Sequence, residues 1–359
     1  MSNVPNVIRN DHKNMDHGFA SPYMISYLTP PPDLALKEGK VELEIDLPLL
    51  DKPQESRRDR VEIYYKTLTR PGSDKWMLLV NGFSSSVKLW DYQLAHLLRN
   101  GYNLVLFDLL GQGNSSKPTD VQYTIAAQVK ILEKLVEETP LRDQKFFLTG
   151  ISAGGMIAQT YALENQEKLK ALCLLATAPK VDGRLSFSQE IQRIYLQNPN
   201  LTDREKISYC AYFLMEHIFS DIFFRKFKPV IYGIIENNIN NNTVGTYLGA
   251  LSSVDDFDVI DKLPSLQIPT LIFTGLHDKT IETHHGIKLN RLIPNSKRYV
   301  LKGVHASHTF IVELFETFNE VFTTELARID QFEPSTMPVH VENSYFQEYP
   351  TDDGPSFDF

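Results

Sequence analysis

Short apolar segments recur along this chain, and most of them are unbroken rather than alternating with polar residues. A continuous apolar run of this length is typical of a strand that is covered on both faces of a sheet. The runs are Trp76–Val80, Leu104–Asp108, Phe146–Leu148, Ala171–Leu175, Thr270–Phe273 and Tyr299–Leu301. Val41–Ile45 and Val61–Lys66 alternate with period two instead, which predicts half-buried antiparallel edge strands joined by the charged segment 51–60.

Segments with apolar residues at helical spacing lie between the predicted strands. Three stripes of this kind are Trp90/Leu94/Leu97/Leu98, Ile125/Val129/Leu132/Val136 and Phe310/Leu314/Phe318/Phe322/Leu326. The last stripe repeats every four residues and predicts one amphipathic C-terminal helix. Buried strands that alternate with amphipathic helices predict an α/β fold, with a mostly parallel sheet and helices on both of its faces. In such a fold, the loops at the carboxyl ends of the strands carry the chemistry.

The alternation stops between residues 180 and 262, where helical patterns rich in Tyr and Phe predict an inserted helical cap. A polar break, Asn237–Asn242, is expected within this insertion. The predicted organisation is therefore an N-terminal arm (residues 1–37), a core (38–179 and 263–329), a helical cap (180–262) and an acidic C-terminal tail (330–359).

The predicted strand at Phe146–Leu148 leads into Gly150-Ile-Ser-Ala-Gly154, and a helix-compatible segment follows from Met156 to Asn165. A serine between two glycines, at a strand-to-helix turn, is the pattern of a nucleophile elbow. The glycines have no Cβ, so the strand and the helix can approach closely on either side of Ser152. The alternative is an ordinary Gly/Ser turn between two buried elements.

A serine nucleophile needs a base, an acid that orients the base, and donors for the oxyanion. Asp278, after the strand at 270–273, is the favoured acid, with a helix N-cap as its alternative role and Asp182 as the second candidate. His308, after the last strand, is the favoured base, with His305 second. The chain order Ser152, Asp278, His308 is the order found in α/β-hydrolases.

The oxyanion donors are expected to be backbone N–H groups beside the nucleophile. Ala153 directly follows Ser152, and Phe83 lies in the turn after the strand at 76–80, where Gly82 permits a close approach. Ser84 could add a hydroxyl, although the run Ser84–Ser86 is equally well explained as a helix N-cap.

No cofactor or metal site is expected from the sequence. The pair His284-His285 is placed on a surface helix, and no acidic or cysteine partner suggests a metal site there. Gly111-Gln-Gly113 lacks the third glycine of a phosphate-binding loop.

The formal net charge is −9, and seven acidic residues without any Lys or Arg lie between 330 and 359, so the rest of the chain carries only −2. No basic stripe indicates nucleic acid. Two cysteines, Cys173 and Cys210, and a polar N-terminus without a signal-like apolar segment favour a reducing, cytoplasmic location, and no run is long enough to span a membrane. The tail is expected to be disordered, or alternatively to dock its aromatic residues on the body or on a second copy in a homo-oligomer.

Together these segments resemble the α/β-hydrolase superfamily, in its serine-nucleophile branch, from about residue 40 to 329. The matching pieces are Asn81-Gly82-Phe83, Asp108–Ser115, Gly150–Gly154, Gly275–Asp278 and His308 with Glu313. The resemblance implies an eight-stranded sheet, a helical cap after the sixth strand, and a Ser152–Asp278–His308 triad.

The chain also departs from the superfamily pattern at three positions. Asn81 stands where most members have His, Leu110 where they have Arg, and Ser307 where a glycine precedes the histidine. The segments Val80–Gly82 and Val105–Leu109 are similar to 3-hydroxyacyl-carrier-protein acyltransferases and thioesterases.

The leading functional hypothesis is a serine hydrolase that cleaves a small-molecule ester or thioester of a fairly apolar acyl group through an acyl-Ser152 intermediate. The alternatives within the superfamily are an acyltransferase, with a (3-hydroxy)acyl group and an acyl carrier as partner, and a hydrolase of carbon–carbon bonds. A non-catalytic sensor on the same fold is the alternative from another class.

Overall fold

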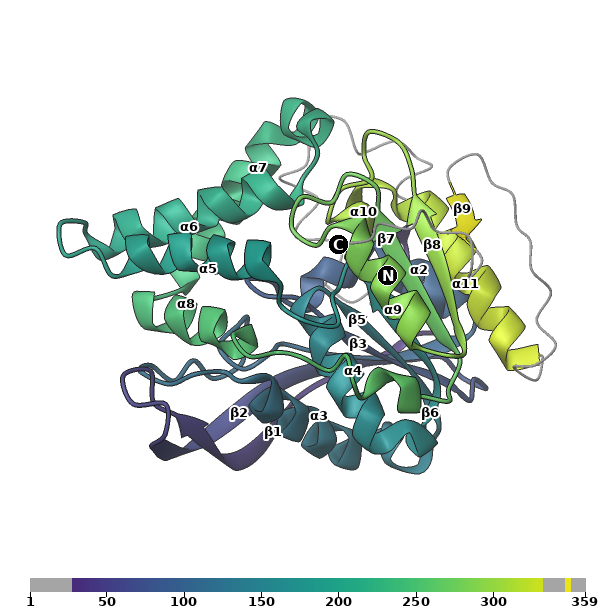
Figure 1. Cartoon of the computed structure of the whole chain (residues 1–359). Helices are drawn as coiled ribbons and strands as arrows, with labels where there is room; N and C mark the ends of the chain where they lie inside the picture. The colour runs from purple at the N-terminus through teal and green to yellow at the C-terminus, as the bar shows by residue number, and fades with distance from the viewer. Residues whose placement is uncertain (1–27, 332–345, 350–359) are drawn as a thin grey trace.

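The computed structural model describes residues 28–331 and the backbone of residues 346–349. Its described strands form one sheet, in the order β1-β2-β4-β3-β5-β6-β7-β8-β9 (Figure 1). The strands are β1 (Ala35–Pro48), β2 (Ser56–Thr69), β3 (Lys75–Val80), β4 (Tyr102–Phe107), β5 (Phe146–Ile151), β6 (Leu169–Leu175), β7 (Thr270–Gly275), β8 (Ser296–Leu301) and β9 (Phe346–Tyr349). The first eight are the strands that the apolar pattern predicts, and β9 is an addition from the segment predicted to be a tail.

The sheet has a parallel centre and antiparallel edges. Strands β3 to β8 pair in parallel, whereas β1 pairs with β2, β2 with β4, and β8 with β9 in antiparallel fashion. The edge ribbon is longer than expected: β1 begins within the segment assigned to the arm, and β2 begins at Ser56, inside the charged segment predicted as a link. Arg58 and Arg60 are therefore strand residues, and they pair with Glu44 and Glu42 across the ribbon. The arm's residues 1–27 lie outside the described part of the chain.

Helices cover both faces of the sheet, because each central strand sends alternate side chains to opposite sides. Leu78 and Val80 of β3 belong to one buried cluster, while Met77 and Leu79 belong to the other. The first cluster includes residues of α3 (Ile125–Glu138), α4 (Ala153–Asn165) and α9 (Thr283–Leu292). The second includes residues of α2 (Asp91–Arg99), α10 (Phe310–Glu313) and α11 (Phe315–Gln331).

The predicted single C-terminal helix is in fact two helices. The chain leaves helical geometry at Leu314, whose backbone has φ −123° and ψ 32°, and this residue separates α10 from α11. Hydrogen bonds of helical spacing still flank the break, from the Leu314 N–H to the Phe310 carbonyl and from the Phe318 N–H to the Leu314 carbonyl. The apolar stripe therefore continues across the break, so its periodicity could not reveal it.

Four helices between β6 and β7 form the inserted cap: α5 (Gly183–Leu196), α6 (Asp203–Ile218), α7 (Asp221–Asn241) and α8 (Val244–Leu251). They share their own apolar cluster, which contains Leu196, Ile207, Met215, Ile235 and Leu251. Figure 1 shows the four helices together on one side of the molecule. The exact domain limits proposed from the sequence remain a prediction.

The polar break predicted at Asn237–Asn242 exists but starts only at Asn242, because α8 begins at Val244. Helix α7 continues to Asn241, and the side chains of Asn238 and Asn241 donate to carbonyl groups four residues earlier in the same helix. A further irregularity lies inside α7 at Phe227 (φ −123°, ψ 28°), two residues before Pro229. Proline has no N–H and its ring collides with the preceding turn, so it bends a helix that it enters.

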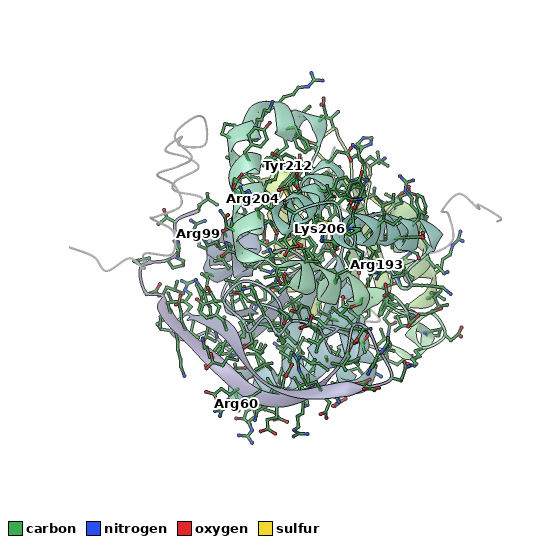
Figure 2. All side chains as sticks on the ribbon, turned by 90° about the vertical axis from the view of Figure 1, so that its left-hand side faces the viewer. Arg60, Arg99, Arg193, Arg204, Lys206 and Tyr212 are labelled. Carbon is green, nitrogen blue, oxygen red and sulfur yellow. The ribbon has the colours of Figure 1, made fainter. Side chains whose placement is uncertain are left out.

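The outer surface of the cap carries both charged and large apolar side chains. Figure 2 shows Arg193, Arg204, Lys206 and Tyr212 on the cap and Arg60 on the edge ribbon at the far end of the molecule. Arg204 forms an ion pair with Glu236 of α7 at 3.0 Å, whereas Tyr212 is half exposed. Of the helices that the structure describes, none combines the length and hydrophobicity needed to cross a membrane.

Candidate active site

Ser152 occupies a sharp turn between β5 and α4. Its backbone has φ 56° and ψ −125°, a conformation that is unfavourable for any residue with a Cβ. The surroundings hold it there, since its N–H donates to the Leu175 carbonyl at 2.9 Å and its carbonyl accepts from the Thr177 hydroxyl at 2.7 Å. The geometry is that of the strained elbow expected from the sequence.

The two flanking glycines are required by close packing. A Cβ on Gly150 would lie 2.3 Å from the Gly154 carbonyl oxygen, and one on Gly154 would lie 2.3 Å from the Val80 carbonyl oxygen. Both distances are far below van der Waals contact, so no larger residue fits at either position. Helix α4 therefore approaches both β5 and the end of β3, which brings the Asn81–Phe83 turn next to Ser152.

Asp278 and His308 lie in contact at the ends of two neighbouring strands. The Asp278 carboxylate accepts a hydrogen bond at its Oδ2 atom from Nδ1 of His308, at 2.8 Å. Both residues are buried. An ionised carboxylate only accepts, so Nδ1 carries the hydrogen and Nε2 is left as an acceptor for another partner.

The second oxygen of Asp278 fixes its own loop. Oδ1 accepts from the N–H groups of Thr280 and Ile281, both at 2.8 Å. The next helix, α9, begins at Thr283 and has Glu282 at its N-cap position, so the helix-cap interpretation of Asp278 was wrong. The two oxygens of the carboxylate therefore have different partners, because one holds the loop and the other orients the imidazole.

The weaker candidates for acid and base lie elsewhere. Asp182 is the N-cap of α5 and accepts from the Leu185 N–H at 2.9 Å. Nδ1 of His305 lies 3.7 Å from the Glu313 carboxylate, and its side chain is 31% exposed. The structure thus brings Asp278 to His308, and it places His305 beside a different carboxylate.

The two candidate oxyanion donors lie on either side of Ser152. The Ala153 N–H belongs to the first residue of α4, so it has no acceptor within the helix. Phe83 lies in the turn after β3, and a Cβ on its neighbour Gly82 would be 3.1 Å from Ser152 Cβ and 3.7 Å from its Oγ. In the serine run, Ser86 caps the short helix at Val87–Trp90, as the alternative interpretation predicts.

Asp108 is a buried residue whose structural role the sequence did not reveal. Its two carboxylate oxygens accept from the Val87 N–H at 2.7 Å and from the Asn114 N–H at 2.8 Å. Burial raises the pKa of Asp108, while these two hydrogen bonds oppose the increase. The residue connects the loop after β4 to the loop after β3, which carries the candidate oxyanion donor Phe83. The only sequence feature that pointed to Asp108 was its position directly after a predicted buried strand.

Glu313 is a second carboxylate of this kind, with a fully buried side chain. It accepts hydrogen bonds from the N–H of Ser220, at 3.0 Å, and from the hydroxyl groups of Ser220 and Ser307. The Thr309 hydroxyl lies 3.2 Å away. Since Ser220 begins a cap helix while Ser307 and Thr309 flank His308, Glu313 connects the cap to the histidine loop. The only sequence feature that pointed to Glu313 was its position five residues after His308.

Comparison with known proteins identifies the family of the chain. Residues 75–313, more than half of the chain, match the family model of the α/β-hydrolase fold. Monoacylglycerol lipase ABHD6 of Bos taurus is 24% identical over 270 residues, which cover 72% of this chain and 77% of the lipase. Proline iminopeptidase of Saccharolobus solfataricus is 27% identical over 255 residues, covering 65% of this chain and 81% of the peptidase.

Solved structures show the same fold. The crystal structure of a hydrolase from Pseudomonas aeruginosa aligns with a TM-score of 0.65 and 22% identity, and the alignment covers 79% of this chain and 98% of that chain. The chain belongs to the α/β-hydrolase fold family. It is an enzyme, and its class is that of the hydrolases.

Proposed function

We propose that this hydrolase cleaves esters or thioesters of fairly apolar acyl groups through an acyl-Ser152 intermediate. The observation that carries the proposal is the buried Asp278–His308 pair, at 2.8 Å, at the same edge of the sheet as the strained Ser152. All three residues follow the carboxyl ends of parallel strands, where this fold class holds its reacting groups.

In the proposed mechanism, the Nε2 atom of His308 accepts the hydroxyl proton as Ser152 Oγ attacks the acyl carbonyl. Asp278 keeps the imidazole in the required tautomer and stabilises its charged form. The N–H groups of Ala153 and Phe83 donate to the oxyanion, and the alcohol or thiol leaves with the proton from His308. Water then enters and attacks the acyl carbonyl while His308 removes its proton, and His308 returns that proton to Ser152 Oγ as the acyl group leaves as a carboxylic acid.

The residues of the cap favour a substrate with an apolar acyl group. Helix α8 reaches the oxyanion turn: its buried Tyr247 hydroxyl donates to Asn238 Oδ1 at 3.3 Å and accepts from the hydroxyl of Ser84. Burial also raises the pKa of Tyr247, so this phenol stays neutral at physiological pH. The relatives of this chain include a monoacylglycerol lipase, an ester hydrolase by name, and a proline iminopeptidase, which is a peptidase by name. The aromatic residues of the cap favour the ester reaction.

The proposal is tested with a fluorophosphonate probe and a substrate series. The series contains p-nitrophenyl esters from acetyl to palmitoyl, acyl-CoA thioesters of the same lengths, and proline p-nitroanilide. We expect the probe to label the wild type, and we expect Ser152→Ala to lose labelling and to lower kcat/KM by roughly 10³-fold or more. The variant Ser265→Ala, which changes an exposed serine far along the chain from the elbow, is the matched control.

The outcomes separate the competing hypotheses. Absence of labelling in a folded wild-type protein would overturn the serine mechanism. Turnover of proline p-nitroanilide without turnover of any ester or thioester would retain Ser152 as nucleophile but would overturn the acyl-ester assignment. A rate that increases with acyl length is the result that we expect.

A further inference from the structure

A cluster of two histidines and one aspartate lies where the cap joins the core. The Asp182 Oδ2 atom is 3.3 Å from Nε2 of His284 and 3.1 Å from Nε2 of His285. Asp182 is the last residue before cap helix α5, and the histidines belong to core helix α9. Residues that are distant in the sequence thus converge, and this gives both histidines an acidic partner that the sequence did not reveal.

The spacing of these three atoms matches that of metal ligands. The candidate ligand atoms all lie within 4.8 Å of one another. In a tetrahedral zinc site with bonds of about 2.0–2.1 Å, neighbouring ligand atoms are separated by roughly 3.3 Å. The two measured separations from Asp182 are close to that value. The third separation, between the two imidazole nitrogens, is no more than 4.8 Å.

The surroundings of the cluster also suit a metal ion. The Glu282 carboxylate lies 3.4 Å from Nδ1 of His284, which leaves Nε2 of that ring available as a ligand. Metal-binding histidines commonly have a carboxylate at the second ring nitrogen.

The cluster is open to solvent on one side, and one of its three residues is held rigidly. The side chain of His285 is only 5% exposed, whereas those of His284 and Asp182 are 51% and 32% exposed. Helix α9 packs so closely on β7 that a Cβ on Gly286 would lie 2.3 Å from the Thr274 methyl group, which holds His285 in place. The exposed side of the cluster leaves room for a water molecule as a fourth ligand.

We propose that Asp182, His284 and His285 bind one divalent transition-metal ion of the zinc type, and that this ion fastens the base of the cap to the core. Two imidazoles and one carboxylate favour zinc and its neighbours in the first transition series over magnesium or calcium, which prefer oxygen ligands. The site contains none of the residues that the proposed acyl-transfer mechanism uses, so the two proposals stand separately.

The fastening role follows from the connections already present at this junction. Next to Asp182, the two chain segments that enter and leave the cap pair with each other through a bridge between Lys180 and Asp258. Arg184 of α5 also forms an ion pair with Glu282 beside α9. A metal bound by Asp182 and both histidines would add a further connection at this junction, so binding should stabilise the folded protein.

The test uses the full chain after removal of metals with a chelator and dialysis. Zinc binding is measured by calorimetry, and the melting temperature is recorded with and without zinc, with magnesium as a comparison. We expect one zinc ion per chain and a higher melting temperature with zinc but not with magnesium. We expect Asp182→Asn and His284→Asn each to weaken zinc binding at least tenfold and to reduce the thermal shift.

Two features keep this test decisive. Asparagine is also a good N-cap, so Asp182→Asn keeps the hydrogen bond to Leu185, and His284 is exposed enough to be replaced without loss of folding. The control is His217→Asn, which alters a cap histidine that pairs with one carboxylate, Glu216, and should leave zinc binding unchanged. Equal binding by the wild type and both site variants, or no binding by the wild type, would overturn the proposal.

Discussion

The choice between His305 and His308 depends on which ring reaches a carboxylate that follows a neighbouring strand. His308 bonds with Asp278, whereas His305 lies on an exposed turn at 3.7 Å from Glu313. We predict that His308→Ala lowers kcat/KM for the best ester by roughly 10³-fold or more, because the base and the later acid are both removed. His305→Ala should cost less than about tenfold. Steady-state kinetics on the purified variants decides, and similar losses in the two variants would contradict the assignment.

Asp108 provides a second prediction for a single residue. A protonated carboxyl keeps a lone pair on each oxygen and can accept from both backbone N–H groups, whereas the NH2 group of asparagine would face one of them. Asp108→Asn should therefore lower the free energy of unfolding by about 1–3 kcal/mol where the carboxyl is protonated. Because the pKa of Asp108 is raised in the fold, its contribution is complete below the ordinary value of 3.8 and is lost as pH rises through the folded-state pKa.

The difference between wild type and Asp108→Asn should therefore become smaller as the pH rises. Urea unfolding at about pH 4.5 and about pH 7.5 measures it, with the exposed Asp51→Asn as control. A difference that grows with pH would show that the two hydrogen bonds outweigh the burial of the charge.

Between elements, Glu313 is the connection on which the histidine loop and the cap depend. Glutamine has the same shape but replaces one acceptor oxygen with a donor, so Glu313→Gln cannot accept from all of its present donors. We predict a lower melting temperature together with a lower kcat, since a displaced Ser307 or Thr309 would shift the His308 ring between them. Glu313→Ala removes every acceptor, so it should lower both quantities further than Glu313→Gln does.

The matched control is Glu320→Gln, which changes an exposed glutamate of the following helix α11. A variant that melts lower but keeps the wild-type kcat would limit Glu313 to a stabilising role. An unchanged melting temperature and an unchanged kcat would show that Glu313 contributes neither to stability nor to catalysis.

For the whole molecule, the short strand β9 covers the edge of the sheet that β8 would otherwise form. It pairs with Arg298–Leu301 of β8, which would otherwise present unpaired backbone groups. We predict that truncation after Gln331 lowers the melting temperature by a few degrees and increases self-association, measured by light scattering. Truncation after Tyr349 keeps β9 and is the control. Equal melting temperatures for the two truncations would mean that β9 contributes no stability.

Regular elements were predictable because local sequence is enough to specify them. The continuous and alternating apolar patterns identified all eight strands of the predicted sheet, since a parallel strand covered on both faces must be apolar throughout and a half-buried edge strand must alternate. The glycines around Ser152 identified the elbow, because only glycine allows the approach of Val80 and Gly154. Breaks inside helices were not predictable in this way: Leu314 interrupts a helix without interrupting its apolar stripe, and Asn238 and Asn241 stay helical through hydrogen bonds that composition does not show.

The sequence alone thus determined the class of fold, the nucleophile candidate and the order of its partners, because periodicity and turn chemistry act over a few residues. Only the tertiary structure decided which histidine meets Asp278, and which residues Asp108 and Glu313 hold in place. It also brought Asp182 next to His284 and His285, across a stretch of chain that includes the whole cap. These contacts join residues that are distant in sequence, and they depend on how strands and helices pack, which no local pattern records.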